Sequence, residues 1–212
     1  MDETKNQREL SIKRHKEALA ELMRDLRVLG YDMESLDSLR RSGIKYDSAI
    51  PVLLDWLPRV SLPDAKESIV RTLSVPWAKP SAGPILLKEF ANAPTNEEWY
   101  PLRWAIGNAI EVVVEAKLLP EIIEIVSNPE NGTARRMFVL ALGKIRDPRS
   151  VPVLIKLLED QQVAGHAIVA LRKLRAPEAL NHLERFVDHP MAWVRKEAKK
   201  AIASIMKNYE LS

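Results

Sequence analysis

The chain has 212 residues, of which 46% are hydrophobic and 29% are charged, and its formal net charge at pH 7 is +3. This composition excludes a disordered chain and is typical of a folded domain. The sequence contains no cysteine, which excludes disulfides, thiolate metal sites and cysteine nucleophiles and agrees with a cytoplasmic location. The charged N-terminus and the lack of an apolar run of about 20 residues predict a soluble, unprocessed protein without a membrane partner.

The charge is unevenly distributed along the chain. Residues 1–31 carry 7 Lys and Arg against 6 Asp and Glu, residues 32–132 carry 10 against 15, and residues 133–212 carry 15 against 8. Such polarity can steer an anionic partner toward the basic part, because the fields of like charges add at short range. Solvated helix faces are the other explanation, and the sequence leaves both open.

The first two predicted helices differ from everything that follows. Residues 4–29 predict one amphipathic helix that ends at Gly30, and a shorter helix follows over residues 33–41. Terminal units of repeat arrays are usually atypical, because one of their faces meets water. The sequence therefore predicts an N-terminal helical cap over residues 1–45.

From residue 46 onward the sequence repeats the pattern of one helical hairpin. Its first helix reads AIPVLLDWL, AGPILLKEF, LLPEIIEIV and SVPVLIKLL, and a fifth copy reads EALNHLERFV. The first four copies share a proline in the first turn, where the missing N–H costs no hydrogen bond: Pro51, Pro84, Pro120 and Pro152. The sequence predicts five hairpins, over about residues 46–75, 79–115, 117–146, 147–174 and 176–206.

The second helix of most hairpins has a small residue at its centre. Aligned copies place alanine there at Ala109, Ala141, Ala170 and Ala201, with spacings of 32, 29 and 31 residues. A small central residue lets neighbouring helices approach closely. A period of this length indicates stacked units, in one continuous array over residues 46–206, rather than one closed core.

An arginine in the second helix also recurs, with an Asx residue in the turn seven positions before it. The three pairs are Asn96 with Arg103, Asn128 with Arg135, and Asp188 with Arg195. Such side chains can bond to each other or to free backbone groups. We expect them to form a structural ladder that ties one hairpin to the next.

The segments DPRSVPVLIKLLED and PMAWVRKEAKKAIASI, with their proline, small residue and Asx-arginine pair, resemble HEAT repeats, in particular the short kind also found in phycobilin lyase subunits. The resemblance covers about residues 46–206. It implies an all-α, armadillo-type superhelix, or solenoid, whose second helices line a concave groove. It implies no reaction, because one fold supports many functions.

In that geometry the candidate groove residues are Trp104, Asn108, Glu111, Arg136, Leu140, Arg172, Lys196, Lys199 and Lys200. Apolar residues flanked by charge suit a protein or peptide partner. We therefore expect a non-enzymatic interaction or scaffold module that needs no cofactor. Whether the tryptophans Trp77, Trp99 and Trp104 fill the core or form a binding surface stays open.

Nucleic-acid binding through the basic C-terminal repeats is the alternative. Lys199 and Lys200 lie near Trp193, and phosphate binding needs such charge along a track. HEAT-like alkylpurine DNA glycosylases are the sharpest enzymatic comparison, and a lyase is another. The glycosylases need a catalytic carboxylate in a basic groove; Trp104 and Arg103 would fit, but no aspartate stands at the groove positions of the second to fifth hairpins.

Metal and common catalytic motifs are not found in the sequence. The four histidines include no pair at the helical spacing of metal ligands. The strings GxGxxG, GxSxG and HExxH and the phosphate loop are absent as well. We expect neither a metal site nor a nucleotide site.

Overall fold

The computed structural model describes residues 2–209, which form helices and contain no β-strand. The all-α prediction is confirmed. The chain divides into two compact units, Met1–Ala109 and Ile110–Ser212, which are described separately below. None of the described helices is both long and apolar enough to cross a membrane.

The N-terminal segment forms two helices, so the prediction of one helix over residues 4–29 was wrong. Helix α1 spans Asp2–Ala18 and α2 spans Ala20–Val28, with Leu19 outside helical geometry at φ −103° and ψ 0°. The break coincides with the start of burial: residues 6–14 are exposed, whereas the apolar stripe of α2 is buried. Gly30 has a φ of +91° and ends α2, as predicted.

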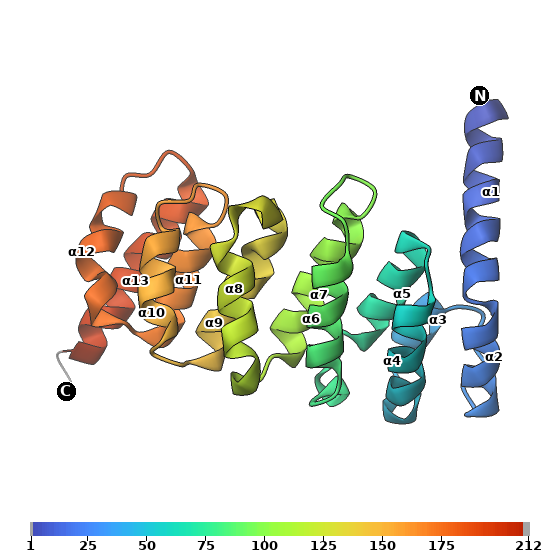
Figure 1. Cartoon of the computed structure of the whole chain (residues 1–212). Helices are drawn as coiled ribbons and strands as arrows, with labels where there is room; N and C mark the ends of the chain where they lie inside the picture. Colours follow the sequence, from blue (N-terminus) through green and yellow to red (C-terminus); the bar gives the residue numbers. More distant parts are fainter. Residues whose placement is uncertain (1, 210–212) are drawn as a thin grey trace. The chain divides into compact units, whose positions relative to one another are not determined.

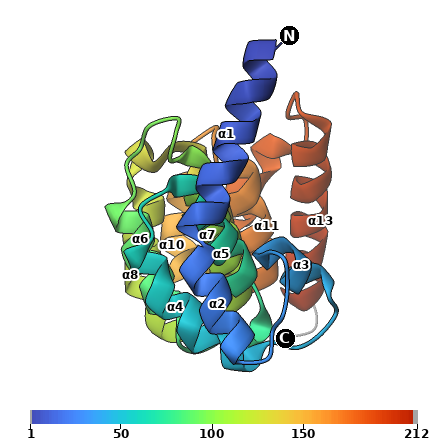
Figure 2. The same ribbon diagram turned by 90° about the vertical axis from the view of Figure 1, so that its right-hand side faces the viewer.

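Helix α3 spans Leu36–Arg41 and is shorter than the predicted helix over residues 33–41. The reason is its cap: the Ser35 hydroxyl accepts a hydrogen bond from Ser38 N at 3.1 Å, which starts the helix at the next residue. Figure 2 shows α1 and α2 following one another in front of α4 and α5.

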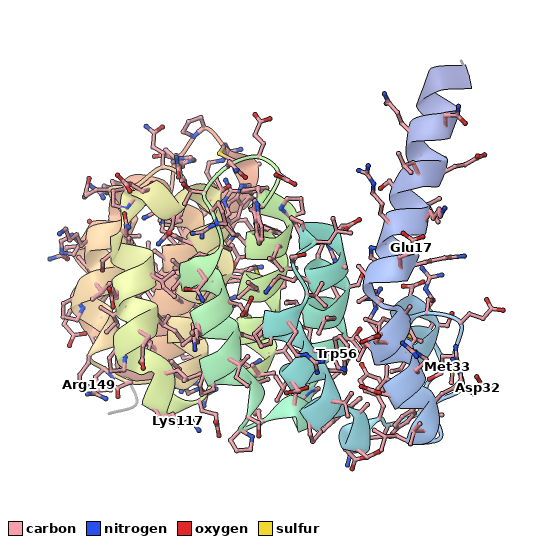
Figure 3. All side chains as sticks on the ribbon, turned by 45° about the vertical axis from the view of Figure 1, so that its right-hand side comes forward. Glu17, Asp32, Met33, Trp56, Lys117 and Arg149 are labelled. Carbon is pink, nitrogen blue, oxygen red and sulfur yellow. The ribbon has the colours of Figure 1, made fainter. Side chains whose placement is uncertain are left out.

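The rest of the first unit consists of α4 (Ile50–Arg59), α5 (Pro63–Leu73), α6 (Ala82–Asn92) and the part of α7 (Tyr100–Val113) up to Ala109. Helix α4 packs against α2 and α5, and α3 packs against α5. Figure 3 shows Trp56 of α4 on the side of α2, where its Nε1 donates to Asp25 Oδ2 at 2.7 Å. The N-terminal helices thus cover the first hairpin.

The second unit is a stack of three hairpins in two layers. Figure 1 shows α8, α10 and α12 in front of α9, α11 and α13, and α11 packs against both α9 and α13. The bounds are α8 Leu119–Ser127, α9 Arg136–Ile145, α10 Ser150–Leu157, α11 Ala164–Leu174, α12 Leu180–Leu183 and α13 Ala192–Tyr209. Short 3-10 helices lie at Asp47–Ala49, Pro76–Ala78, Ala116–Leu118, Pro129–Arg135, Pro177–Ala179 and Glu184–Phe186.

The small residues of the second helices set how closely these helices approach. Ala141, Ala170 and Ala201 are fully buried. A Cβ added at Gly143 of α9 would lie 2.7 Å from the Cα of Ala170 in α11, so the backbones of these helices are almost in contact. This close approach holds the second helices in one continuous layer within the unit.

Candidate partner-binding site

The recurring arginines bind the turns of their own hairpins. Arg103 is buried, and its Nη1 donates to the carbonyl oxygens of Phe90 and Ala93 at 2.9 and 2.6 Å. Arg195 Nη1 donates to the carbonyls of His189 and Pro190 at 2.7 and 2.8 Å. These carbonyls lie at the ends of first helices or in the following turns, where the helix offers them no partner.

Arg135 also reaches the next hairpin. Its Nη1 donates to Val126 O at 3.0 Å and its Nε to Gly132 O at 2.9 Å, both in its own hairpin. Its Nη2 donates to Asp160 Oδ2 at 2.6 Å, in the turn between α10 and α11. Asp160 was missed in the sequence because the turn of that hairpin is shortened, which moves the carboxylate out of the expected offset.

The predicted turn residues bond locally rather than to the arginines. Asn96 Oδ1 accepts from Trp99 N at 3.1 Å, and Asn128 Oδ1 accepts from Glu130 N at 3.0 Å. Both bonds satisfy free N–H groups at the start of the next helical turn. Asp188 is exposed in the corresponding turn.

Charged side chains link neighbouring second helices in the second unit. Lys144 Nζ of α9 donates to Glu111 O at 2.6 Å and lies 3.6 Å from its carboxylate. Arg172 of α11 lies 3.2 Å from Glu197 Oε2 of α13, and Lys200 Nζ donates to Glu197 Oε1 at 2.7 Å. One half-buried carboxylate therefore offsets two of the residues that were predicted to make the groove basic.

The remaining groove candidates of this unit form fewer hydrogen bonds and ion pairs with their neighbours. Leu140 is half-buried, and Arg136 Nε donates to Gln162 O at 2.9 Å. Lys196 and Lys199 are exposed, and no acidic side chain of residues 6–207 forms an ion pair with either. We call the following set the second-helix face: Glu111, Leu140, Lys144, Arg172, Lys196, Glu197, Lys199 and Lys200.

Trp104 and Asn108 lie on the part of α7 that belongs to the first unit. Both are half-buried, and Asn108 Nδ2 donates to Trp104 O at 2.9 Å. Trp77 belongs to the packing of the first unit, since its ring meets buried Tyr46 edge-on at 5.4 Å. Trp99 is half-buried.

A small cavity of about 170 Å³ lies at the N-terminal ends of α9, α11 and α13. We call it the Trp193 pocket; Arg136, His166, His189, Met191 and Trp193 contribute to its lining. The rings of His166 and Trp193 meet edge-on at 5.6 Å. Burial, with a contribution from the charge of Arg136, lowers the pKa of His166 to about 4, so this imidazole is neutral near pH 7.

Glycine at position 165 makes this pocket possible. A Cβ there would lie 2.0 Å from Cη2 of Trp193, so the indole lies directly against the α11 backbone. The aligned positions of the neighbouring hairpins hold the large residues Trp104, Arg136 and Lys196. A lone glycine in a column of large side chains is the sequence signal that could have revealed the contact.

The first unit contains a larger cleft, of about 740 Å³, between α1 and α2 on one side and α3 and α5 on the other. In it His15 Nδ1 lies 3.3 Å from Asp64 Oδ2, and His15 Nε2 lies 3.3 Å from Ser68 Oγ. This is the atom order of a hydrolase triad, but Asp64 is exposed and Ser68 lies inside a helix, where backbone N–H groups are committed to helical bonds and cannot stabilise an oxyanion. The contacts tie α1 to α5.

No group of three or more His, Asp or Glu that could hold a metal ion occurs among the described residues.

A family model of HEAT repeats matches residues 83–164 and 119–203, which together make up more than half of the chain. The chain belongs to the HEAT repeat family. The predicted family and the all-helical repeat fold are thereby confirmed, and HEAT repeats generally act as scaffolds for protein interactions. The chain matches no curated protein and no solved structure.

Proposed function

We propose that this HEAT-repeat protein is a non-enzymatic interaction module that binds a partner protein through the second-helix face of residues 110–209. The observation that supports it is the composition of this face: half-buried Leu140 lies on the same layer as exposed Lys196 and Lys199, which form no ion pair with the acidic side chains of residues 6–207. An apolar contact surrounded by charge suits protein recognition, in which charge sets orientation and partner choice.

The ion pairs of the face support binding rather than catalysis. The Glu111 carboxylate forms an ion pair with Lys144, and the Glu197 carboxylate forms ion pairs with Arg172 and Lys200, so both carboxylates lie beside cations. A general acid or base needs a pKa matched to its task and access to substrate. We propose that the face orders neighbouring helices and presents a fixed charge pattern, in the cytoplasm, a location that the lack of cysteine supports.

The same pairs disfavour nucleic acid as the partner. Phosphate binding needs a run of free cations along a track. With Arg172 and Lys200 sharing Glu197, the track predicted from sequence is reduced at its centre.

Site-specific photo-crosslinking tests the proposal. A photoreactive phenylalanine analogue would replace Leu140 or Lys199 of the second-helix face, or the exposed Glu124 of α8 or Lys156 of α10 as matched controls. We expect a discrete protein adduct in cell extract from the first two positions and none from the controls. Equal adducts from both sets, or adducts from the first-helix positions alone, would refute the assignment of the face.

A further inference from the structure

We propose that the Trp193 pocket receives one apolar side chain from an acidic segment of the partner protein. This inference deepens the proposed function and rests on it. The Trp193 pocket would be a second contact point for the same partner, at the N-terminal ends of the second helices.

The size of the pocket indicates what it can hold. Its volume of about 170 Å³ is well below the roughly 300–1,000 Å³ of small-molecule and cofactor sites. A cavity of this size accepts a single side chain. It therefore fits an anchor residue of a protein partner better than a free metabolite.

The lining indicates an apolar anchor. Phe186 and His189 stack at 5.9 Å, and Trp193 meets the His166 ring. His166 is half-buried and neutral near pH 7, so the pocket holds no fixed charge from this residue. Binding of an aliphatic or aromatic side chain removes apolar surface of both the pocket and the bound side chain from water, which favours association.

The rim is exposed, apolar and already ordered. Met191 is 53% exposed and Trp193 is 42% exposed, which is unusual for side chains of this size. Arg195 holds the turn before α13 through the His189 and Pro190 carbonyls. Little ordering is then needed when a partner binds, and this lowers the entropic cost of association.

The charges around the pocket favour acidic flanks. Arg136 lines the pocket, and its described hydrogen bond uses only Nε, which leaves its terminal donors for a carboxylate. Lys196, one turn after Trp193, has no acidic partner among residues 6–207. The nearby carboxylates Asp160 and Glu159 are bonded to Arg135 and Arg185.

Fluorescence anisotropy with synthetic peptides tests the inference on the full chain. The probe is a short, labelled peptide of Asp and Glu with one central Leu; the matched peptides carry Gly in place of Leu, or Lys in place of the acids. We expect the acidic Leu peptide to bind at least about tenfold more tightly than either. Equal binding of the Gly peptide, tighter binding of the basic peptide, or no binding would overturn the proposal.

Variants locate the contact. Trp193→Ala and Met191→Ser should each weaken the acidic Leu peptide, the first by about tenfold or more. Arg136→Gln should weaken the acidic peptides by about fivefold, and Lys173→Ala, which removes an exposed cation elsewhere on α11, should change nothing. Circular dichroism confirms that each variant is folded; Met191 is exposed, so its variant keeps the test valid if Trp193→Ala does not fold. Unchanged affinity in folded variants at both positions would place the peptide elsewhere.

The two proposals fail in different ways. If adducts form from Leu140 and Lys199 but the acidic Leu peptide shows no preference, the second-helix face stands and the pocket assignment is wrong. If neither is observed, both are wrong. If duplex DNA displaces the peptide and Trp193→Ala has no effect on either, the basic residues bind phosphate and the pocket assignment is wrong.

Discussion

Lys66 and Glu89 form an ion pair that links α5 to α6 and is almost fully enclosed, with both side chains 8% exposed. Lys66 Nζ also donates to Leu57 O at 2.8 Å. Removal of one partner from such a pair leaves an uncompensated charge away from water, which strongly lowers the free energy of unfolding. The pair is therefore a test of packing in the first unit.

Glu89→Ala should lower the free energy of unfolding by about 3–5 kcal/mol, because Lys66 would stay buried without its carboxylate. Urea unfolding followed by circular dichroism measures the change. Asp55→Ala, which removes an exposed pair with Arg59, is the control and should cost about 1 kcal/mol or less. A similar small loss at Glu89 would show that Lys66 reaches water in the variant.

His166 should make stability depend on pH. Its pKa is about 4 in the folded protein against an ordinary value of 6.5, so the unfolded chain binds this proton more strongly. Its contribution is complete above pH 6.5 and is lost as the pH falls toward about 4. After allowance for solvent screening the loss is about 1–2 kcal/mol.

The measurement is urea unfolding at several pH values between about 7 and 4 for the wild type and His166→Gln. The variant should lose less stability over this interval, because glutamine binds no proton. Parallel curves for the two proteins would show that His166 is not desolvated as the structure indicates.

At the scale of helices, the predicted hairpins follow from the spacing of prolines and alanines, because both residues act locally: proline in the first turn and alanine at the point of closest approach. The break at Leu19 was not predictable in the same way. The hydrogen bonds from Leu19 N to His15 O and from Met23 N to Leu19 O persist across it, so the local pattern remains helical. The Trp193 pocket depends on a contact between residues 28 positions apart, which no local pattern encodes.

Gly143 lies where the backbones of α9 and α11 approach each other closely. Gly143→Ala should raise helix propensity by about 1 kcal/mol yet destabilise the fold overall, because overpacking costs about 1–3 kcal/mol and here the new methyl group would meet the Ala170 backbone. The thermal unfolding midpoint measures the balance. Ala203→Leu, at an exposed position of α13, is the matched control and should be tolerated. A rise in midpoint for Gly143→Ala would mean that α9 and α11 can move apart freely.

At the scale of the whole molecule, the sequence shows the excess of Lys and Arg over Asp and Glu in residues 133–212. It does not show which of these cations form ion pairs within the fold. Sequence could not show that Glu197 would hold two of the cations, since that depends on how α11 and α13 pack. The candidate face was predicted from register alone, and that prediction did not account for the pairing of Glu197 with Arg172 and Lys200. Among the cations of the second-helix face, Lys196 and Lys199 are those that form no ion pair with an acidic side chain of residues 6–207.

The association rate with an acidic partner should reflect those two lysines. Lys196→Glu with Lys199→Glu should lower the rate constant by about tenfold at low salt, with a smaller change in dissociation. Stopped-flow fluorescence with the acidic Leu peptide measures both. Lys117→Glu with Lys156→Glu makes the same change in net charge elsewhere and is the control. Equal effects of the two pairs would assign the rate to total charge instead of to this face.

The guanidinium of Arg135 bonds to carbonyls of its own hairpin and to Asp160 of the next one. A chain shortened after residue 146 would lose the Asp160 carboxylate and the hairpin that carries it, so the Arg135 charge would lose the one carboxylate described beside it. The number of repeats in this protein is consequently not freely adjustable. A deletion that shortens the array at this junction requires a compensating substitution at position 135.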